Sequence, residues 1–166
     1  MDAIFKRRSI RRYTEEDISD FMVKKILEAG MNAPSAGNEQ PWHFIVVREK
    51  SNLKEISKCS SYSWMLKDAT VGIIVCGDLS LAKHGEFWIQ DCSAATENML
   101  IEIAELGLGG VWLGVYPVEE RVKYLRKYFN LPDHIVPFSI ISIGYPAQEI
   151  KEVNRYREER VHYEKW

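Results

Sequence analysis

Apolar residues recur along the chain with the spacing of amphipathic helices. Residues 19–30 carry them at intervals of about 3.6 residues, which predicts a helix with Ser19 as its N-cap. The longest such stretch, residues 87–106, predicts the central helix. A third helix is expected at residues 117–129, with Pro117 in its first turn.

Shorter segments are rich in β-branched and aromatic residues and are bounded by turn residues. They predict strands at residues 42–47, 71–76, 111–116 and 136–143. The glycine-rich run at 107–110 supplies the positive φ angles that the end of the central helix requires. Because helices and strands alternate without a regular βαβ rhythm, we expect an α+β fold, with helices around a mixed or antiparallel sheet.

We expect a single domain over residues 1–166, since no linker, repeat or low-complexity block divides the chain. Its 46% hydrophobic and 28% charged residues suit a globular protein that needs no disulfide or structural metal. From Glu149 onward the sequence is strongly charged, and Tyr156, Tyr163 and Trp166 stand among the charges. This pattern indicates a surface tail whose aromatic rings pack against a partner subunit.

Charge and cysteine content exclude several classes of protein. A net charge of -2 argues against a general nucleic-acid binder. Cys59, Cys76 and Cys92 have no CxxC spacing, so they are interpreted as buried free thiols. Neither a signal peptide nor an apolar run of membrane length is found, so we expect a cytoplasmic protein without membrane or nucleic-acid partners. The four histidines share no ligand spacing, and no metal is expected.

Basic residues are concentrated near the N-terminus. Arg7, Arg8 and Arg11, with Ser9 among them, offer guanidinium forks and a hydroxyl that match phosphate oxygens. The cluster therefore predicts an anion site just after a short helix. On spacing alone, a solvated charged segment remains the alternative.

A second candidate segment, residues 33–42, is rich in small, amide and proline residues. Asn38 and Gln40 there offer hydrogen bonds to a flat ligand, although an ordinary connection between a helix and a strand uses the same residue types. The chain has no Rossmann or P-loop fingerprint and no recognisable nucleophile motif. If it is an enzyme, we expect a bound cofactor to carry the reactive atom.

Four segments, in their order and spacing, resemble the nitroreductase family of FMN-dependent oxidoreductases. They are residues 7–13, 33–44, 90–109 and 111–117. The resemblance spans nearly the whole chain and fits the short members of the family. It implies an α+β sandwich in an intertwined homodimer, with tightly bound FMN at the subunit interface.

The resemblance also implies which residues contact FMN. Arg11 falls where a cation lies near the N1 and C2 carbonyl edge of the flavin and stabilises its reduced form. Gly114 falls where the backbone lies along the flavin ring near N5. The resemblance therefore implies that Arg11 and Gly114 tune the flavin, and no side chain is expected to be catalytic. The other implied contacts are Arg7, Arg8, Ser9, Leu113, the loop residues Pro34, Ser35, Ala36 and Asn38, partly from the other subunit, and Arg155 and Arg157 in the tail.

The implied activity is ping-pong transfer of hydride from NADH or NADPH, by way of FMN, to a nitroaromatic, quinone or similar small acceptor. Two alternatives stay open: a non-catalytic flavin-binding protein, or another chemistry on the same fold, such as dehalogenation, flavin destruction, or enoyl or azole reduction. Larger family members carry a lysine and an asparagine in the stretch that corresponds to residues 62–66, where this chain has neither. The resemblance therefore does not imply the acceptor or the preferred nucleotide.

Overall fold

The computed structural model describes residues 3–149, 151 and 153–166. Its centre is a four-stranded sheet in the order β1-β2-β4-β3, in which every neighbouring pair is antiparallel. The expected α+β class is therefore confirmed, and the sheet is antiparallel rather than mixed. The strands are β1 (Trp42–Val47), β2 (Val71–Asp78), β3 (Gly109–Gly114) and β4 (Ile135–Gly144).

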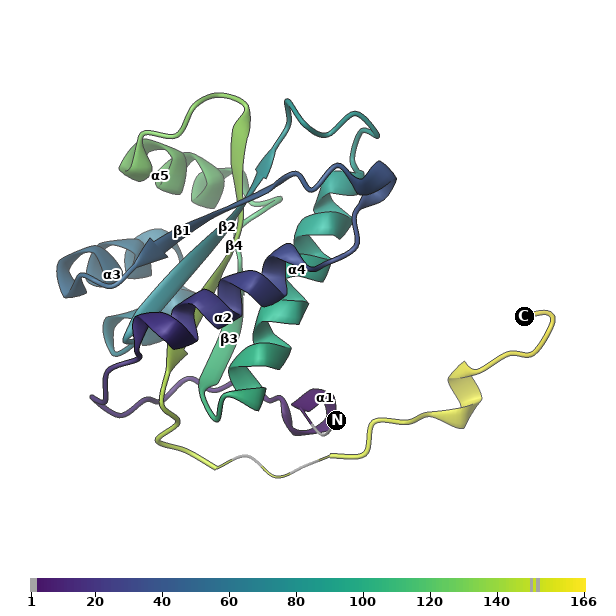
Figure 1. Cartoon of the computed structure of the whole chain (residues 1–166), viewed down its shortest axis with the longest axis horizontal. Coiled ribbons are helices and arrows are strands. Elements are labelled where there is room, and N and C mark those ends of the chain that lie inside the picture. Colours follow the sequence, from purple (N-terminus) through teal and green to yellow (C-terminus); the bar gives the residue numbers. More distant parts are fainter. Residues whose placement is uncertain (1–2, 150, 152) are drawn as a thin grey trace.

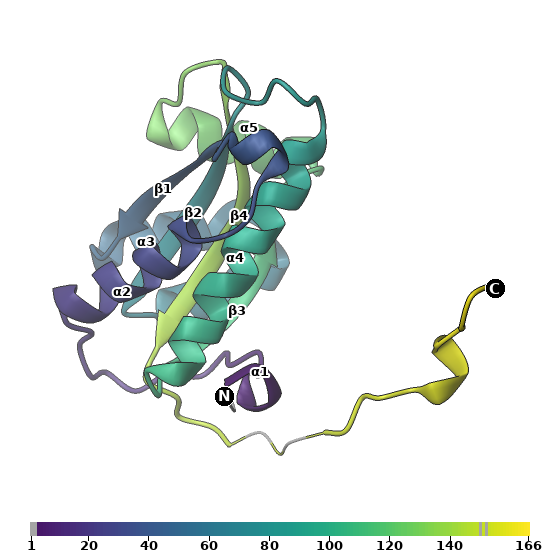
Figure 2. The same cartoon turned by 45° about the vertical axis from the view of Figure 1, so that its right-hand side comes forward.

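Helices cover both faces of this sheet (Figures 1 and 2). One layer contains α2 (Asp20–Met31) and α4 (Phe87–Glu105). The other contains α3 (Lys50–Ile56), α5 (Glu119–Phe129) and the 3-10 segments Ser57–Cys59 and Ser61–Lys67. The short helix α1 (Ala3–Lys6) contacts α4, and 3-10 turns lie at Ala36–Asn38 and Glu158–Arg160.

The alternation of side chains along β2 explains the two helical layers. Ile73 and Val75 pack in the cluster that includes α2 and α4, whereas Ile74 and Cys76 pack in the cluster that includes α3 and α5. All of β2 is buried. A strand covered on both faces needs few polar residues, which is why its sequence from residue 71 to residue 77 has no polar side chain.

The strongest sequence signals are confirmed. The Ser19 Oγ accepts a hydrogen bond from the Met22 N at 3.3 Å and caps α2. The central helix α4 ends one residue before the expected limit, and Gly107 follows with a φ of 74°. The helix α3 and the 3-10 segments after it were not predicted. These segments are too short to show a helical period.

The start of β3 was predicted two residues too late. Gly109 and Gly110, expected to belong to the helix end, are strand residues. A Cβ on Gly109 would lie 2.6 Å from the Cγ2 of Ile10, and Ser9 forms a parallel bridge to Gly110. These glycines therefore serve the close approach of the N-terminal segment and not the end of the helix.

The place of Pro117 was also predicted wrongly. The helix α5 begins at Glu119, and Val118 is its N-cap. Pro117 lies in the turn after β3, which is closed by a hydrogen bond from the Val118 N to the Val115 O at 2.9 Å. Pro117 is the third residue of this turn and follows a cis peptide bond, which is the place that proline takes in a type VI turn.

The C-terminal tail runs below α1 and then away from the body, as expected for a surface segment (Figures 1 and 2). Its large apolar side chains are exposed, from Val161 at 40% to Tyr163 at 82% and Trp166 at 100%. Trp166 stacks on His162 of the same tail, with 4.3 Å between ring centroids. The body of the described subunit therefore does not bury these aromatic rings.

The three cysteines are free thiols. Cys76 and Cys92 are buried as expected, and burial raises the pKa of Cys76 to about 12. The expectation was wrong for Cys59, which is only half-buried beside α5. None of the helices in the described part of the chain combines the length and the apolar character that a membrane crossing needs.

Candidate functional site

Arginines from both ends of the chain meet at one cavity. It has a volume of about 530 Å³ and lies between α1 and the tail, where Arg7, Arg8 and Arg155 line it. Ile4 and Phe5 add an apolar wall. No aspartate or glutamate is among the described residues that line it. Three guanidinium groups without a lining carboxylate make the cavity electropositive.

Local contacts hold these arginines in place. The Arg8 Nη1 donates to the carbonyls of Phe5 and Arg7, both at 2.7 Å, and the Arg7 Nε lies 3.1 Å from the Glu97 Oε1 on α4. The Arg8 Nε also reaches the Lys151 carbonyl of the tail at 3.4 Å. A guanidinium has five N–H donors, so each arginine keeps donors for an anion.

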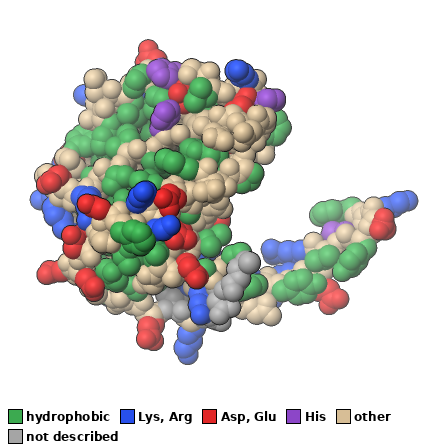
Figure 3. Space-filling view, in the orientation of Figure 1, with side chains coloured by type: hydrophobic (Ala, Val, Ile, Leu, Met, Phe, Trp, Pro, Cys, Tyr) green, Lys and Arg blue, Asp and Glu red, His purple; other side chains and the backbone are tan. Residues whose placement is uncertain are grey.

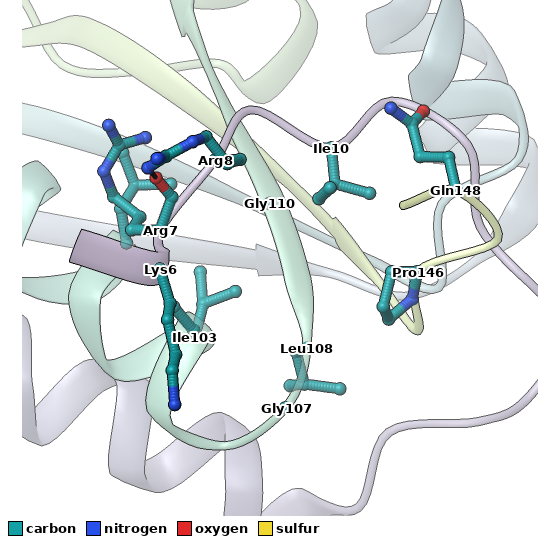
Figure 4. Close-up of a pocket in the computed structure, with 12 residues that line it drawn as sticks. Lys6, Arg7, Arg8, Ile10, Ile103, Gly107, Leu108, Gly110, Pro146 and Gln148 are labelled. Carbon is teal, nitrogen blue, oxygen red and sulfur yellow. Dashed lines mark hydrogen bonds between the residues drawn. The ribbon is translucent and has the colours of Figure 1, made fainter. Parts of the chain in front are cut away.

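A smaller cavity of about 210 Å³ adjoins the same arginines. Figure 4 shows Arg7 and Arg8 at one side of it, with Pro146 and Gln148 at the other. The Gln148 Oε1 accepts a hydrogen bond from the Arg11 N at 3.3 Å. The arginine segment is thus tied to the chain that leaves β4.

A third cavity, of about 310 Å³, brings together Arg11, Leu113 and Gly114. The Leu113 side chain is buried in the core, so its backbone is the part that a ligand can reach. A Cβ on Gly114 would meet nothing within 4 Å, so its backbone borders open space. A flat ring can lie directly on such a backbone.

The loop residues Pro34, Ser35 and Ala36 line a fourth cavity of about 340 Å³, near the start of α4. The Asp91 Oδ1 accepts a hydrogen bond from the Ala36 N at 2.9 Å. Further along the loop, the Asn38 Oδ1 accepts a hydrogen bond from the Gln40 Nε2 at 3.0 Å. The two amides expected to meet a ligand therefore bond each other.

Within one subunit, the candidate residues thus fall into three groups at separate cavities. Arg7, Arg8 and Arg155 form one group, Arg11, Leu113 and Gly114 another, and the loop the third. Ser9 holds the N-terminal segment against β3, and Arg157 is exposed on the tail and lines none of the described cavities. The described subunit does not join all the candidates at one place.

Three features of the site were not predicted from the sequence. Asp91 is 5% exposed, and its Oδ2 has no hydrogen-bond partner in the described structure. Its signal was an acidic residue on the apolar face of the central helix. The Arg121 Nη1 donates to the Gly114 carbonyl at 2.7 Å, and His84 packs on the loop. No sequence pattern marked either residue.

The His84 side chain packs against the loop that contains Gly37 and Glu39. Its Nδ1 lies 2.6 Å from the Glu39 Oε1, and a Cβ on Gly37 would lie 2.5 Å from the His84 Cε1. Burial raises the pKa of Glu39, but the hydrogen bonds and charge of His84 oppose this, and the net pKa is below its ordinary value. The Glu39–His84 pair therefore holds a loop in which Gly37, Asn38 and Gln40 all have positive φ.

The family model described as "Nitroreductase family" matches this chain over residues 4–70 and 57–145. The chain belongs to the nitroreductase family. It is 52% identical over 167 residues to an Archaeoglobus fulgidus protein provisionally named NADH dehydrogenase/NAD(P)H nitroreductase, with 98% of this chain and 96% of that protein covered.

Solved structures of family members have the same fold. A Clostridium acetobutylicum protein provisionally described as an NADH oxidase has a TM-score of 0.97 and 46% identity, over 99% of this chain and 100% of that chain. A provisionally named nitroreductase from Desulfovibrio desulfuricans, solved in complex with FMN, has a TM-score of 0.85 and 34% identity, over 99% and 96%. The resemblance drawn from the four sequence segments is therefore confirmed at the level of family and fold.

We expect Glu39→Gln to destabilise this nitroreductase-family protein in a pH-dependent way. Because folding lowers the pKa of Glu39, its charge stabilises the fold above the pKa of the unfolded carboxyl, and this contribution is lost as the pH falls through the folded pKa. Urea unfolding between about pH 3 and pH 7 should show the wild type more stable near pH 6, and the two curves converging in acid.

The matched control is Glu15→Gln, which neutralises an exposed carboxyl that has no ion pair in the described structure. It should leave the free energy of unfolding nearly unchanged. A wild type and a Glu39→Gln variant with equal stability at every pH would contradict the role given to this pair.

Proposed function

We propose that this chain, an FMN-dependent NAD(P)H oxidoreductase of the nitroreductase family, reduces small nitroaromatic or quinone acceptors in a ping-pong cycle, as a homodimer. The nicotinamide nucleotide and the acceptor use one cavity in turn. The observation that carries the proposal is the convergence of Arg7, Arg8 and Arg155 on one cavity. These guanidinium groups come from both ends of a chain whose net charge is negative, and a bound anion would balance their positive charge.

The residues present fit FMN in charge and in shape. The arginine forks of Arg7, Arg8 and Arg155 match a phosphate, and the open space beside Gly114 suits a flat ring. Arg11 lines the same cavity as Gly114 and supplies a fixed cation where negative charge develops. Bound FMN would supply the two-electron hydride chemistry that no side chain here provides.

The relatives support the cofactor and the nucleotide. The Desulfovibrio desulfuricans structure contains FMN, and a Bacillus subtilis protein 28% identical to this chain, over 95% of it and 70% of that protein, is named FMN reductase [NAD(P)H]. The contacts of all the candidate residues with FMN stay predictions, those of Ser9, the loop residues and Arg157 included, as does a cytoplasmic location. We propose no nucleic-acid or membrane partner.

The homodimer is proposed from the separation of the site residues. Asp91 anchors the loop near the start of α4, whereas Arg7 and Arg8 share a cavity with Leu100 and Ala104 near its end. These positions are roughly 14 to 20 Å apart along the helix, at about 1.5 Å per residue. A second copy in the opposite orientation would bring its loop to this end.

The tail gives a second reason for two copies. Figure 3 shows it standing apart from the body, with hydrophobic side chains along it. Exposed rings such as Tyr163 and Trp166 cost free energy in water, and burial against a second chain removes that cost. The tail is therefore proposed as an arm that packs on the partner.

We expect the purified protein to be yellow and to show the absorbance of bound FMN. Under anaerobic conditions, NADH or NADPH should bleach the flavin, and menadione or a nitroaromatic should restore its colour. Absorbance spectra before and after each addition measure cofactor and activity together. A protein that gains no flavin absorbance on titration with FMN would refute the cofactor, and flavin that neither nucleotide bleaches would favour a non-catalytic flavin-binding protein.

We expect Arg7→Ala combined with Arg155→Ala to weaken FMN retention by orders of magnitude, because each charge-assisted bond to a phosphate contributes about 1.5 to 3 kcal/mol. Equilibrium dialysis against free FMN measures the change. Glu97→Gln removes the ion pair of Arg7 but keeps its guanidinium, and Arg160→Ala removes a tail arginine outside the cavity. Both controls should retain FMN, and unchanged retention in the double variant would place the phosphate elsewhere.

We expect a mass of twice the 19.3 kDa of one chain in light scattering after size exclusion. The combined variant Tyr163→Ser and Trp166→Ser should shift this equilibrium toward the single chain, because it removes aromatic surface that only a partner can bury. Glu159→Gln, also exposed on the tail, is the matched control. A single-chain mass at all concentrations for the wild type would refute the dimer.

A further inference from the structure

Arg121 is a cation whose use the proposed function does not explain. It lies in the first turn of α5, is half-buried, and fixes its position by donating from Nη1 to the Gly114 carbonyl at 2.7 Å. In the described part of the chain its guanidinium makes no ion pair and no second hydrogen bond. Most of its five N–H donors are therefore available to a ligand.

The cavity that Arg121 lines is positively charged. Arg11 also lines it, and no aspartate or glutamate is among its described lining residues. The acidic residue Glu119, two positions before Arg121, lies 2.8 Å from the Lys123 Nζ and is paired there. Two guanidinium groups with little compensating charge favour an anionic ligand.

Aromatic side chains stand beside these cations. Tyr62 is 73% exposed and Trp64 is 46% exposed, and both line the same cavity together with Trp112. Large exposed aromatic rings at the mouth of a pocket offer flat faces on which a planar ligand can stack. The open space beside Gly114 adds a flat backbone surface to the same cavity.

We propose that Arg121 is a specificity-determining residue, which binds the carboxylate or sulfonate of a planar aromatic electron acceptor in this cavity. The inference rests on the proposed function, in which Arg11 serves the cofactor and leaves Arg121 as the second cation. A guanidinium binds a carboxylate through two parallel N–H bonds, and Arg121 is already positioned by Gly114. The carboxylate or sulfonate of the acceptor would therefore be held in a fixed position relative to the Gly114 backbone, which borders the proposed flavin site.

The test compares 4-nitrobenzoate, which carries a carboxylate, with nitrobenzene, which does not. The kcat/KM for 4-nitrobenzoate is divided by the kcat/KM for nitrobenzene, and this ratio is measured for the flavin-loaded wild type and for Arg121→Gln. Their different intrinsic reactivity cancels when the ratios are compared. The ratio should fall about 10- to 100-fold in Arg121→Gln, the range expected for a lost charge-assisted hydrogen bond.

Two further variants sharpen the comparison. Arg121→Lys keeps the charge but not the fork, so its ratio should be intermediate. Lys127→Gln removes an exposed cation of α5 that has no ion pair in the described structure and lies outside the cavity, and it should leave the ratio unchanged. An unchanged ratio in Arg121→Gln overturns the inference. A selective rise of KM for NADPH with an unchanged ratio also overturns it, and assigns Arg121 to a nucleotide phosphate.

A binding measurement separates this inference from the proposed function. If neither nucleotide bleaches the flavin, the proposed function fails, but calorimetric titration of the purified protein with benzoate still tests Arg121. Weaker benzoate binding in Arg121→Gln than in Lys127→Gln supports the anion site. Equal affinity in the wild type and Arg121→Gln refutes it.

Discussion

The burial of β2 and β4 between two helical layers is the constraint on which the rest of the structure depends. Every residue of β2 and all but the first of β4 are buried. Side chains on these strands serve packing, so groups that bind a ligand must come from the segments at the ends and edges of the sheet. The candidate residues at 7–11, 34–38 and 113–121 lie in such segments.

Close packing against the sheet edge then positions the N-terminal arginines. The Tyr13 hydroxyl donates to the Ile10 carbonyl at 2.8 Å and lies 3.1 Å from the Ser142 Oγ of β4. Burial raises the pKa of Tyr13, so this hydroxyl stays protonated and keeps donating. A Cβ on Gly144 would lie 2.6 Å from the Cγ of Tyr13, so glycine leaves the space that the ring fills. The arginine segment is thereby fixed along β3.

The site is defined by positive charge arranged around space. Arg7, Arg8 and Arg155 surround one cavity, and Arg11 and Arg121 line another in which described carboxylates are absent. The chain as a whole is slightly acidic, so this arrangement is local. In the functions proposed above, the first group would bind a phosphate of the cofactor, and Arg121 would bind an anionic group on the acceptor.

Strong periodicity allowed α2 and α4 to be predicted, because burial of one helix face leaves a regular apolar pattern, and short runs of β-branched and aromatic residues allowed the strands to be predicted. The segment between α3 and β2 could not be predicted, since its short 3-10 turns have no such pattern. Arg7, Arg8 and Arg155 were predicted as candidates and line one cavity, whereas Asp91, His84 and Arg121 were not predicted. Their roles depend on neighbours distant in sequence, such as Ala36 beside Asp91.

The sequence alone was enough to predict the α+β class, the places of α2, α4 and the four strands, and the presence of arginines at both ends of the chain. The periodic burial of apolar side chains is a local property, and a sequence records it directly. Only the tertiary structure decided that Arg155 faces Arg7, that the loop is held at Asp91, and that Arg121 reaches Gly114. Such contacts depend on the path of the whole chain, which spacing along the sequence does not encode.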